Sequence, residues 1–236
     1  MTVAADPTRE SDLLITFNTS GLSKFSFAVS GKNEDLNIIL IKKIVTRPRE
    51  NIVVLDAGHG GRDTGARGSL IDEKIINLDV TMKVGKLLQE KGIRVEYTRT
   101  DDSYVDLEER SAIANSLNAA LFVSIHSNSS TRSEPNGTET FFYAPLHTPE
   151  LYLQRDERLQ IATLLQNQLI SSLKRTNRGV KEENYSVLRN TQMPSALVEI
   201  AFLSNADDQA LLVQDQFRSQ AAQAIASAIE QYMKGI

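Results

Sequence analysis

The chain of 236 residues contains no cysteine. It therefore has no disulfide, no thiolate zinc site and no thiol redox motif, and any metal site must use histidine and carboxylate ligands. The absence of cysteine also fits an exported protein that avoids mispaired disulfides, without proving export.

Long apolar runs and an excess of positive charge are missing as well. No run approaches the ~20 apolar residues that a membrane helix needs. The net charge of −4 and a pI near 5.5 argue against nucleic-acid binding, which usually requires a basic face. The N-terminus, MTVAADPTRE, shows neither the basic nor the apolar region of an export signal. Removal of such a signal, or a chain that is part of a longer protein, is compatible with this observation.

Residues 1–48 differ in character from the remainder. Leu13–Phe17 and Phe25–Val29 are typical of two short strands around a Ser/Gly turn, and Asn37–Ile41 is a candidate third strand. A charged junction that contains Pro48 follows, and no residue in this segment suggests chemistry. We interpret 1–48 as an N-terminal extension or linker, or as the remnant of a neighbouring module.

The stretch NIVVLDAGHGGRDTGARG, residues 51–68, holds the first candidate site residue. Its apolar run Ile52–Leu55 predicts a buried strand, and a glycine-rich loop with His59 follows directly. Because open α/β sheets bind ligands at the carboxyl ends of their strands, His59 is placed as a metal ligand or an acid–base group. A loop histidine that merely packs beside a strand explains this stretch about equally well.

A second apolar run that ends in a histidine occurs further along the chain. Residues 120–125 predict a buried strand, and His126 comes at its end. Right-handed crossovers make neighbouring strands of such a sheet parallel, so His59 and His126 can converge at one edge. The third histidine, His147, lies in a loop with two prolines, and we expect it to be exposed to solvent.

Two carboxylates stand out for different reasons. Glu73 falls in the first turn of a predicted helix that ends near Lys91, where an acidic residue that complements the helix dipole is an alternative explanation. Glu199 lies inside the apolar run 196–203, where an ionised group is costly unless it is paired or bound to metal. A strand with one solvated face would also hold Glu199, but its neighbours do not alternate with polar residues.

The remaining pattern predicts one α/β domain, with a mostly parallel twisted sheet of about six strands and helices on both faces. The predicted strands are 52–55, 93–98, 120–125, 137–143, 185–188 and 196–203, and the predicted helices are 73–91, 106–117, 155–175, 206–213 and 216–234.

Two histidines, one carboxylate and an open position form the His₂Glu pattern of catalytic zinc sites. A second buried carboxylate near the metal would take a proton from water and pass it to a leaving nitrogen. The chain offers His59, Glu73, His126 and Glu199 for these tasks. No HExxH motif is present, which excludes a zincin, and the wide spacing of the four residues is not specific by itself.

Residues 51–233 resemble the catalytic domain of the zinc-dependent N-acetylmuramoyl-L-alanine amidases, which are bacterial cell-wall hydrolases. The matching segments, in family order, are VVLDAGHGGRDTGARG, EKIINLDV, LEERSAIAN, LFVSIHSNSS, GTETFFY and MPSALVEIAFLSN. The resemblance implies a catalytic domain over residues 49–236 and one Zn²⁺ held by His59, Glu73 and His126, with Glu199 as the essential catalytic carboxylate. It also implies the substrate, which is the peptidoglycan amide between the lactyl group of N-acetylmuramic acid and L-alanine.

The same resemblance implies a periplasmic or cell-wall location, and an activator or cell-wall-targeting module outside this chain. Some family members carry a long insertion after the strand that corresponds to 138–143, and a helix of that insertion blocks the zinc. Only residues 144–154 occupy this place here, so we expect no built-in autoinhibitory helix.

Three further residues are less specific candidates. Asp56 would either accept an imidazole N–H or support the glycine loop, and both are equally compatible with its position. Asn128 and Arg67 are placed to contact sugar or peptide. Two other functions stay open: a zinc hydrolase that cleaves a different muropeptide bond, such as a carboxypeptidase, and a degenerate amidase that only binds peptidoglycan.

Overall fold

The computed structural model describes residues 2–5, 13–16, 22–30, 35–42 and 49–235, with side chains over 49–235. The chain divides into two compact units, 1–47 and 48–236. In the first unit, β1 (Thr2–Ala5) pairs with β2 (Leu13–Thr16) and β3 (Leu22–Ser30) pairs with β4 (Asp35–Lys42), both antiparallel. Three of these four strands overlap predicted ones, whereas β1 was not predicted. The last residue of the first predicted strand, Phe17, lies outside the described residues.

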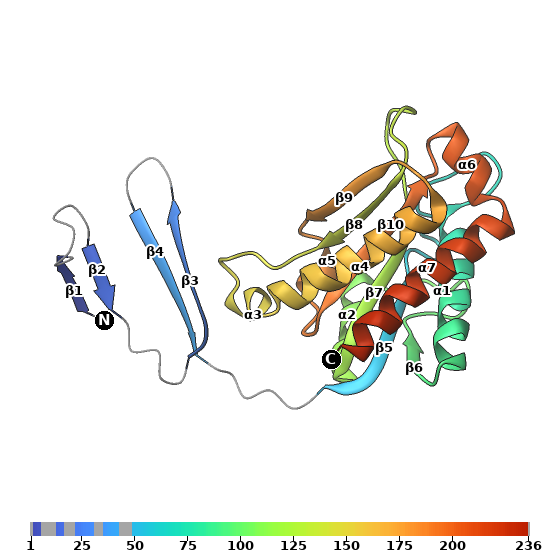
Figure 1. The fold of residues 1–236 in the computed structure, drawn as a ribbon. Helices are drawn as coiled ribbons and strands as arrows, with labels where there is room; N and C mark the ends of the chain where they lie inside the picture. The colour runs from blue at the N-terminus through green and yellow to red at the C-terminus, as the bar shows by residue number, and fades with distance from the viewer. Residues whose placement is uncertain (1, 6–12, 17–21, 31–34, 43–48, 236) are drawn as a thin grey trace. The chain divides into compact units, whose positions relative to one another are not determined.

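The second unit is built on a six-stranded sheet in the order β6-β5-β7-β10-β8-β9 (Figure 1). The strands are β5 (Glu50–Ala57), β6 (Arg94–Tyr97), β7 (Ala119–Asn128), β8 (Thr138–Phe142), β9 (Asn177–Glu182) and β10 (Ser195–Phe202). All neighbouring pairs are parallel except β10 and β8, which are antiparallel. The predicted six-stranded, mostly parallel sheet is confirmed.

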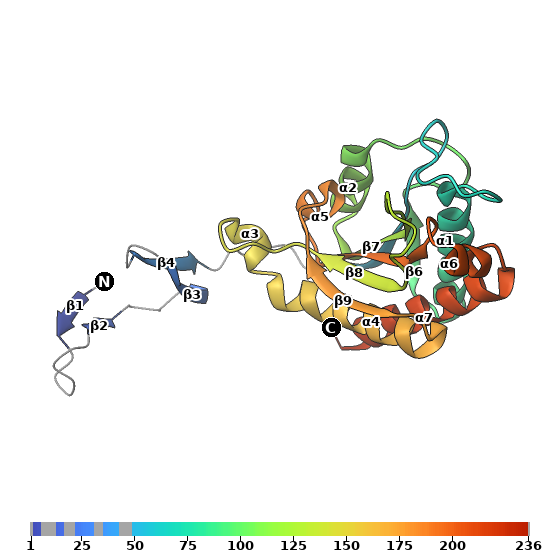
Figure 2. The ribbon, with the colours of Figure 1, turned by 90° about the horizontal axis from the view of Figure 1, so that it is seen from above.

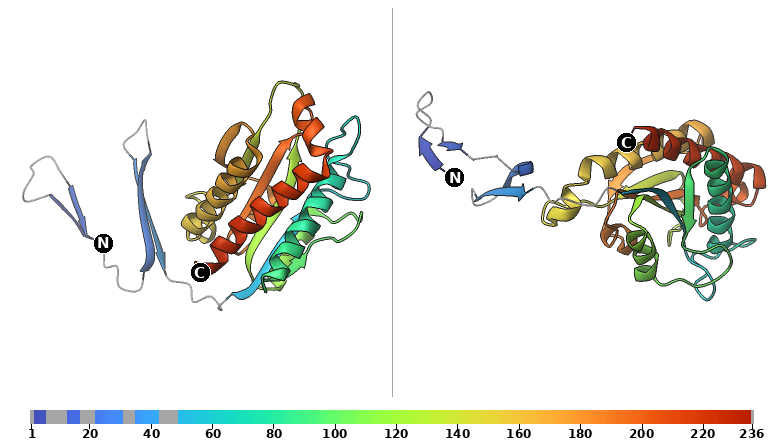
Figure 3. Two further views of the ribbon diagram at one scale, coloured as in Figure 1. Left: turned by 45° about the vertical axis from the view of Figure 1, so that its right-hand side comes forward. Right: turned by 90° about the horizontal axis from the view of Figure 1, so that it is seen from below.

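Helices cover both faces of this sheet, as predicted (Figures 2 and 3). The helices α1 (Glu73–Glu90), α4 (Arg155–Leu173) and α7 (Asp215–Lys234) pack on one face, and α2 (Leu107–Ser116) and α5 (Ser186–Arg189) pack on the other. Two short helices, α3 (Pro149–Tyr152) and α6 (Ala206–Leu212), complete the domain. Within the part of the chain that the structure describes, no helix has the length and apolarity to cross a membrane.

The central strands are apolar on both faces because helices cover both. Val53 and Val198 belong to the larger core, under α1, α4 and α7, while Val54 and Leu197 belong to the smaller core beneath α5. This two-sided burial explains why the sequence shows continuous apolar runs instead of alternation. It also means that a polar residue inside such a strand needs a specific partner or a function.

The predicted strand 185–188 is wrong. Residues 186–189 form the single helical turn α5, in which Val187 and Leu188 are buried, and the sixth strand is β9, residues 177–182. A buried turn with two adjacent apolar residues gives the same short pattern as a strand. The true strand, NRGVKE, lies at the edge of the sheet and is mostly polar, so its pattern resembles a loop.

The reversed direction of β8 determines which segments reach which edge of the sheet. The strands β5, β7 and β10 have their carboxyl ends along one edge of the sheet, the edge that is formed by strand ends and not by an outermost strand. Strand β8 begins at that same edge because it runs antiparallel to β10. The segment 144–154, which follows β8, therefore starts from the opposite edge.

Candidate metal centre and cavity

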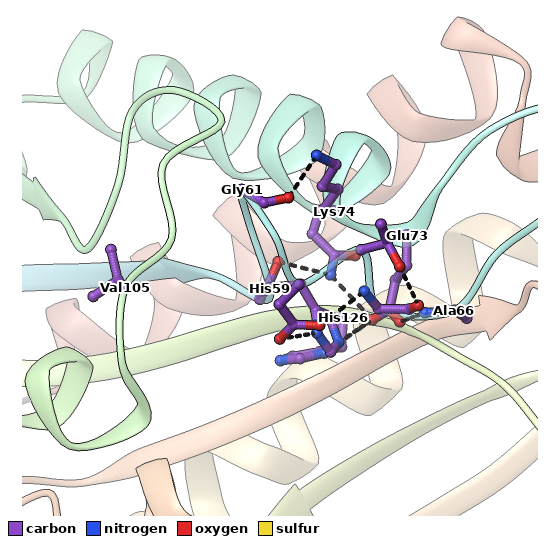
Figure 4. A network of polar contacts seen from close by, with 12 residues as sticks. His59, Gly61, Ala66, Glu73, Lys74, Val105 and His126 are labelled. Carbon is purple, nitrogen blue, oxygen red and sulfur yellow. Dashed lines mark hydrogen bonds and ion pairs between the residues drawn. The ribbon is translucent and has the colours of Figure 1, made fainter.

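The ends of β5 and β7 bring His59 and His126 together. Their imidazole centroids are 4.8 Å apart, with the rings nearly perpendicular. Glu73, the first residue of α1, reaches between them: its Oε1 lies 3.2 Å from His59 Nε2 and 3.0 Å from His126 Nδ1 (Figure 4). Ligand atoms of all three side chains lie within 4.8 Å of one another.

Two glycines leave the space that these side chains occupy. A Cβ atom at Gly58 would lie 2.2 Å from His126 Nε2, and one at Gly65 would lie 2.5 Å from Glu73 Oε2 and 2.6 Å from His59 Cδ2. Gly65 also has φ = +63°, and His59 itself has φ = +62°, an uncommon value for a residue with a side chain. The glycine loop thus wraps closely around the histidines and Glu73.

The Glu73 carboxylate is held in its ionised form. Its Oε2 accepts a hydrogen bond from Ala66 N (2.8 Å), and Oε1 accepts from Asn77 Nδ2 (3.1 Å) and Ser127 N (3.2 Å). Burial alone would raise the pKa of Glu73, but hydrogen bonds and charge interactions with His126 and His59 bring it well below its usual value. The triad is therefore anionic at its centre and suited to a cation.

The donor set fits a tetrahedral zinc ion. With metal–nitrogen bonds of about 2.0–2.1 Å, such an ion separates its ligand atoms by roughly 3.3 Å. The distances from Glu73 Oε1 to the two imidazole nitrogens, 3.0 and 3.2 Å, are close to this value. On the other side of the first ring, His59 Nδ1 lies 2.9 Å from Asp63 Oδ2, the type of contact that orients metal-binding imidazoles.

A cavity of about 320 Å³ opens beside the triad. Glu199 lines it from β10, where it is the register partner of His126. Its Oε2 is buried and has no hydrogen-bond partner among the described residues. Burial, together with the negative charges of Glu73 and Glu139, raises the pKa of Glu199 well above its usual value. This carboxyl group is available for a molecule that enters the cavity.

Comparison with known proteins identifies the domain. A sequence profile described as N-acetylmuramoyl-L-alanine amidase matches residues 53–231. The chain belongs to this amidase family. It is 41% identical over 180 residues to the uncharacterised Bacillus subtilis protein YqiI (76% of this chain, 84% of YqiI). It is 32% identical over 232 residues to the N-acetylmuramoyl-L-alanine amidase LytC of the same species (94% of this chain), and it spans only 45% of LytC.

The amidase fold is also seen in a solved relative. The catalytic domain of CwlV, an N-acetylmuramoyl-L-alanine amidase from Bacillus (Paenibacillus) polymyxa var. colistinus, superposes with a TM-score of 0.71 at 36% identity. The superposition covers 78% of this chain and 99% of the CwlV domain.

Of the residues predicted from sequence, six line the amidase cavity: Asp56, His59, Glu73, His126, Asn128 and Glu199. Two others lie elsewhere. Arg67 is exposed and is absent from the cavity lining, and His147 is exposed in the segment that starts from the opposite edge of the sheet.

Asp56 also lines the cavity, but its hydrogen bonds are to other groups than an imidazole. Its carboxylate accepts from Arg110 Nη1 (2.8 Å), Thr98 Oγ1 (2.6 Å) and Ser124 Oγ (2.6 Å). Arg110 in turn donates to the carbonyl oxygens of Ala57 and His59. These contacts favour the second of the two roles considered for Asp56, the support of the glycine loop.

Sequence reasoning missed Glu139 and Asp63. Glu139 is buried at the start of β8 as the register partner of Glu199, and it accepts a hydrogen bond from Asn128 Nδ2 (2.7 Å). Its strand, TETFF, is buried throughout but begins with three polar residues, so the sequence does not mark Glu139 as an anomaly in the way that it marks Glu199. Asp63 is an acid four residues after His59, a spacing that carries little signal without the loop geometry.

Proposed function

We propose that the chain is a zinc-dependent amidase that cleaves the bond between the lactyl group of N-acetylmuramic acid and L-alanine in peptidoglycan. One observation carries the proposal: the His59–Glu73–His126 triad and the unpartnered carboxyl group of Glu199 border the same cavity. Membership of the amidase family supplies the identity of the bond.

We assign one Zn²⁺ per chain to the imidazole nitrogens of His59 and His126 and the carboxylate of Glu73. Zinc in such a site supplies Lewis acidity toward a carbonyl oxygen and lowers the pKa of water. The protein groups prepare the site for this ion. Glu73 is ionised, and Asp63 keeps the first imidazole oriented through Nδ1.

Glu199 is the proton carrier in this proposal. It takes a proton from water as the water oxygen forms a bond to the carbonyl carbon, and it passes that proton to nitrogen as the C–N bond breaks. The products are a lactyl carboxylic acid on the glycan and a stem peptide with a free L-alanine amino group. The raised pKa of Glu199 suits both halves of this task, because it makes the carboxylate a stronger base toward water and lets it hold the proton until nitrogen accepts it.

We also propose that the cavity needs no internal helix to be displaced. No residue of 144–154 lines the cavity, and this segment begins at the far edge of the sheet. The site of action in this proposal is the cell wall or periplasm, in cell-wall remodelling or cell separation. An activator or a wall-targeting module outside this chain is compatible with it.

The test is dye release from labelled peptidoglycan by the purified chain, with and without a chelator, beside Glu199→Gln. We expect release by the zinc-loaded wild type and none in either control. Zinc content separates the roles: His59→Ala and His126→Ala should lose zinc, whereas His147→Ala, a matched change at an exposed histidine, should keep it.

Product analysis separates the alternatives. An amidase leaves new amino groups on L-alanine, whereas a carboxypeptidase releases a C-terminal amino acid. A zinc-loaded wild type that releases no dye without an added partner would contradict the open-cavity proposal. If the zinc-loaded wild type binds peptidoglycan but does not cleave it under any condition, the chain is a peptidoglycan-binding protein and the amidase proposal is wrong.

A further inference from the structure

Two cations lie beyond Glu199 on the edge strand of the sheet. Arg178 and Lys181, both on β9, form ion pairs with the same buried carboxylate, Glu139. The Arg178 and Lys181 side chains are 32% and 42% exposed, so both remain open to solvent. The proposed catalytic steps use none of these three residues.

The pair carries more positive charge than Glu139 neutralises. Two cations share one carboxylate, and Arg178 uses only its Nε for that contact (2.9 Å). Within 49–235, the two terminal guanidinium nitrogens of Arg178 have no hydrogen-bond acceptor. Aromatic rings support both cations, Phe202 under Arg178 at 4.8 Å and Phe141 under Lys181 at 5.7 Å. A guanidinium with free terminal N–H groups is well suited to bind a carboxylate with two hydrogen bonds.

The strand order fixes where this pair lies relative to the chemistry. His126, Glu199 and Glu139 are successive register partners on β7, β10 and β8, and β9 follows next in the sheet. Neighbouring strands are about 4.8 Å apart, so the two strand spacings from β10 to β9 separate Glu199 from the backbone of the cations by roughly 10 Å. Three residues of an extended peptide, at about 3.3 Å each, cover this distance.

The other end of the cavity has a different character. Tyr104, in the loop before α2, and Leu107, the first residue of α2, line this end and are 40% and 56% exposed. Helix α2 packs on β7. Apolar and aromatic surfaces of this kind suit the apolar face of a sugar ring or a lactyl methyl group. The guanidinium of Arg62 lies over the Tyr104 ring, 4.2 Å from its centroid, so one cation is present at this end as well.

We propose that the stem peptide runs from Glu199 toward β9 and that Arg178 and Lys181 bind a free carboxylate within its first three residues, while the sugar lies toward Tyr104 and Leu107. The inference rests on the proposed function, since it orients that substrate in that cavity. It assigns β9 as the element that recognises the charge state of the stem peptide.

The test compares two soluble muropeptides, one with free stem carboxyl groups and the same compound with those groups amidated. Zinc-loaded Glu199→Gln protein is titrated with each, so that binding is measured without turnover. We expect about fivefold to tenfold tighter binding of the free acid, given partly exposed charge-assisted hydrogen bonds. This preference should decline as salt is added, whereas binding of the amide should hardly change.

Two double variants test which cations cause the preference for the muropeptide with free carboxyl groups. Arg178→Gln with Lys181→Met should abolish this preference and leave the affinity for the amidated compound unchanged. Arg94→Gln with Lys234→Met, a matched loss of two exposed cations on β6 and at the end of α7, should retain it. Loss of both cations leaves the buried Glu139 carboxylate without a counter-ion, so the pair of changes is repeated with Glu139→Gln to restore folding.

Equal affinity for the two muropeptides, or a preference that survives removal of both cations, would overturn the inference. In the wild type, the free acid should show a lower KM at an unchanged kcat. If the protein prefers the free-acid muropeptide in binding but the wild type cleaves neither compound, the inference about β9 holds and only the proposed amidase function is contradicted.

Discussion

Glu73 and Glu199 are two glutamates that line one cavity, and their neighbours shift their pKa values in opposite directions. Glu73 is surrounded by two imidazoles and three N–H donors, which favour its ionised form. Glu199 has a buried oxygen without a partner and two carboxylates nearby, which favour its protonated form. A pair of carboxyl groups whose surroundings separate their pKa values in this way divides naturally into a ligand and a proton carrier.

Replacement of Glu199 by glutamine should abolish hydrolysis and stabilise the zinc-free protein. Because the folded pKa of Glu199 is raised, its contribution to stability is fully present only below its usual pKa of 4.5 and is lost as the pH rises through the folded value. Glutamine stays neutral, so the variant should melt a few degrees above wild type at pH 7, with a difference that vanishes near pH 4.5.

Thermal melts across this pH range check the Glu199→Gln prediction. Glu90→Gln, at the exposed end of α1, is the control and should melt like wild type at every pH. A Glu199→Gln protein less stable than wild type at pH 7 would show that the carboxylate has a stabilising partner.

Gly65→Ala should strongly weaken zinc binding while the domain stays folded. The added methyl group would meet Glu73 and His59 at 2.5–2.6 Å, in a backbone conformation with φ = +63°. We expect about 100-fold weaker zinc binding, at the upper end of what changes around metal ligands produce.

The control for Gly65→Ala is Gly92→Ala, which has the same backbone strain (φ = +77°) without any atom within 4 Å. It should cost about 1 kcal/mol of stability and leave zinc affinity unchanged. Equal zinc affinity in the two variants would mean that the glycine loop moves freely and does not shape the site.

At the scale of elements, strand ends were predictable and strand directions were not. Apolar runs that end in His59 and His126 identify two buried parallel strands, and parallel strands end at one edge. Nothing in the pattern of TETFF says that β8 runs antiparallel, so the place of Glu139 beside Glu199 could not be inferred. Strand β9, with Arg178 and Lys181, lies at the side of the sheet and is largely exposed to solvent, so its residues are mostly polar. For this reason its sequence contains no apolar run that would predict a strand.

Arg158 stabilises the connection between α5 and β10 through hydrogen bonds to its backbone. It is fully buried on α4, and its guanidinium donates to the carbonyl oxygens of Leu188 (2.7 Å), Thr191 (2.8 Å) and Met193 (2.8 Å). No carboxylate pairs with it among the described residues. Burial, with a smaller repulsion from Arg49, lowers its pKa to about 9, so it remains charged at neutral pH. The Arg158 side chain thus supplies the hydrogen-bond donors that these buried carbonyl groups would otherwise need from the backbone.

Arg158→Met should therefore destabilise the domain by about 3–5 kcal/mol, because several buried carbonyl groups lose their donor at once. Urea unfolding measures the change. Arg155→Met, three residues earlier on the same helix, removes a half-exposed arginine and should cost about 1 kcal/mol or less. Similar losses in both variants would mean that water takes over the carbonyl groups that Arg158 serves.

At the scale of the whole molecule, every residue that lines the cavity lies in the unit 48–236. That unit also has its own hydrophobic core, with side chains from all three large helices. A compact unit with its own core and its own site is expected to fold alone.

Removal of residues 1–47 should leave zinc content, melting temperature and kcat/KM on a soluble muropeptide unchanged. These three measurements on the shortened chain, beside the full chain, check the prediction. A loss of turnover with zinc retained would give the first unit a part in substrate binding, and a loss of folding would contradict the division into two independent units.

The antiparallel course of β8 has a practical consequence for attachment. The segment that contains the exposed His147 starts from the edge of the sheet opposite the cavity, and the chain has no thiol of its own. His147→Cys would thus provide one unique reactive sulfur for a fluorophore or a solid support. A protein immobilised there would present its cavity outward, clear of the surface, to a polymer as large as an intact cell wall.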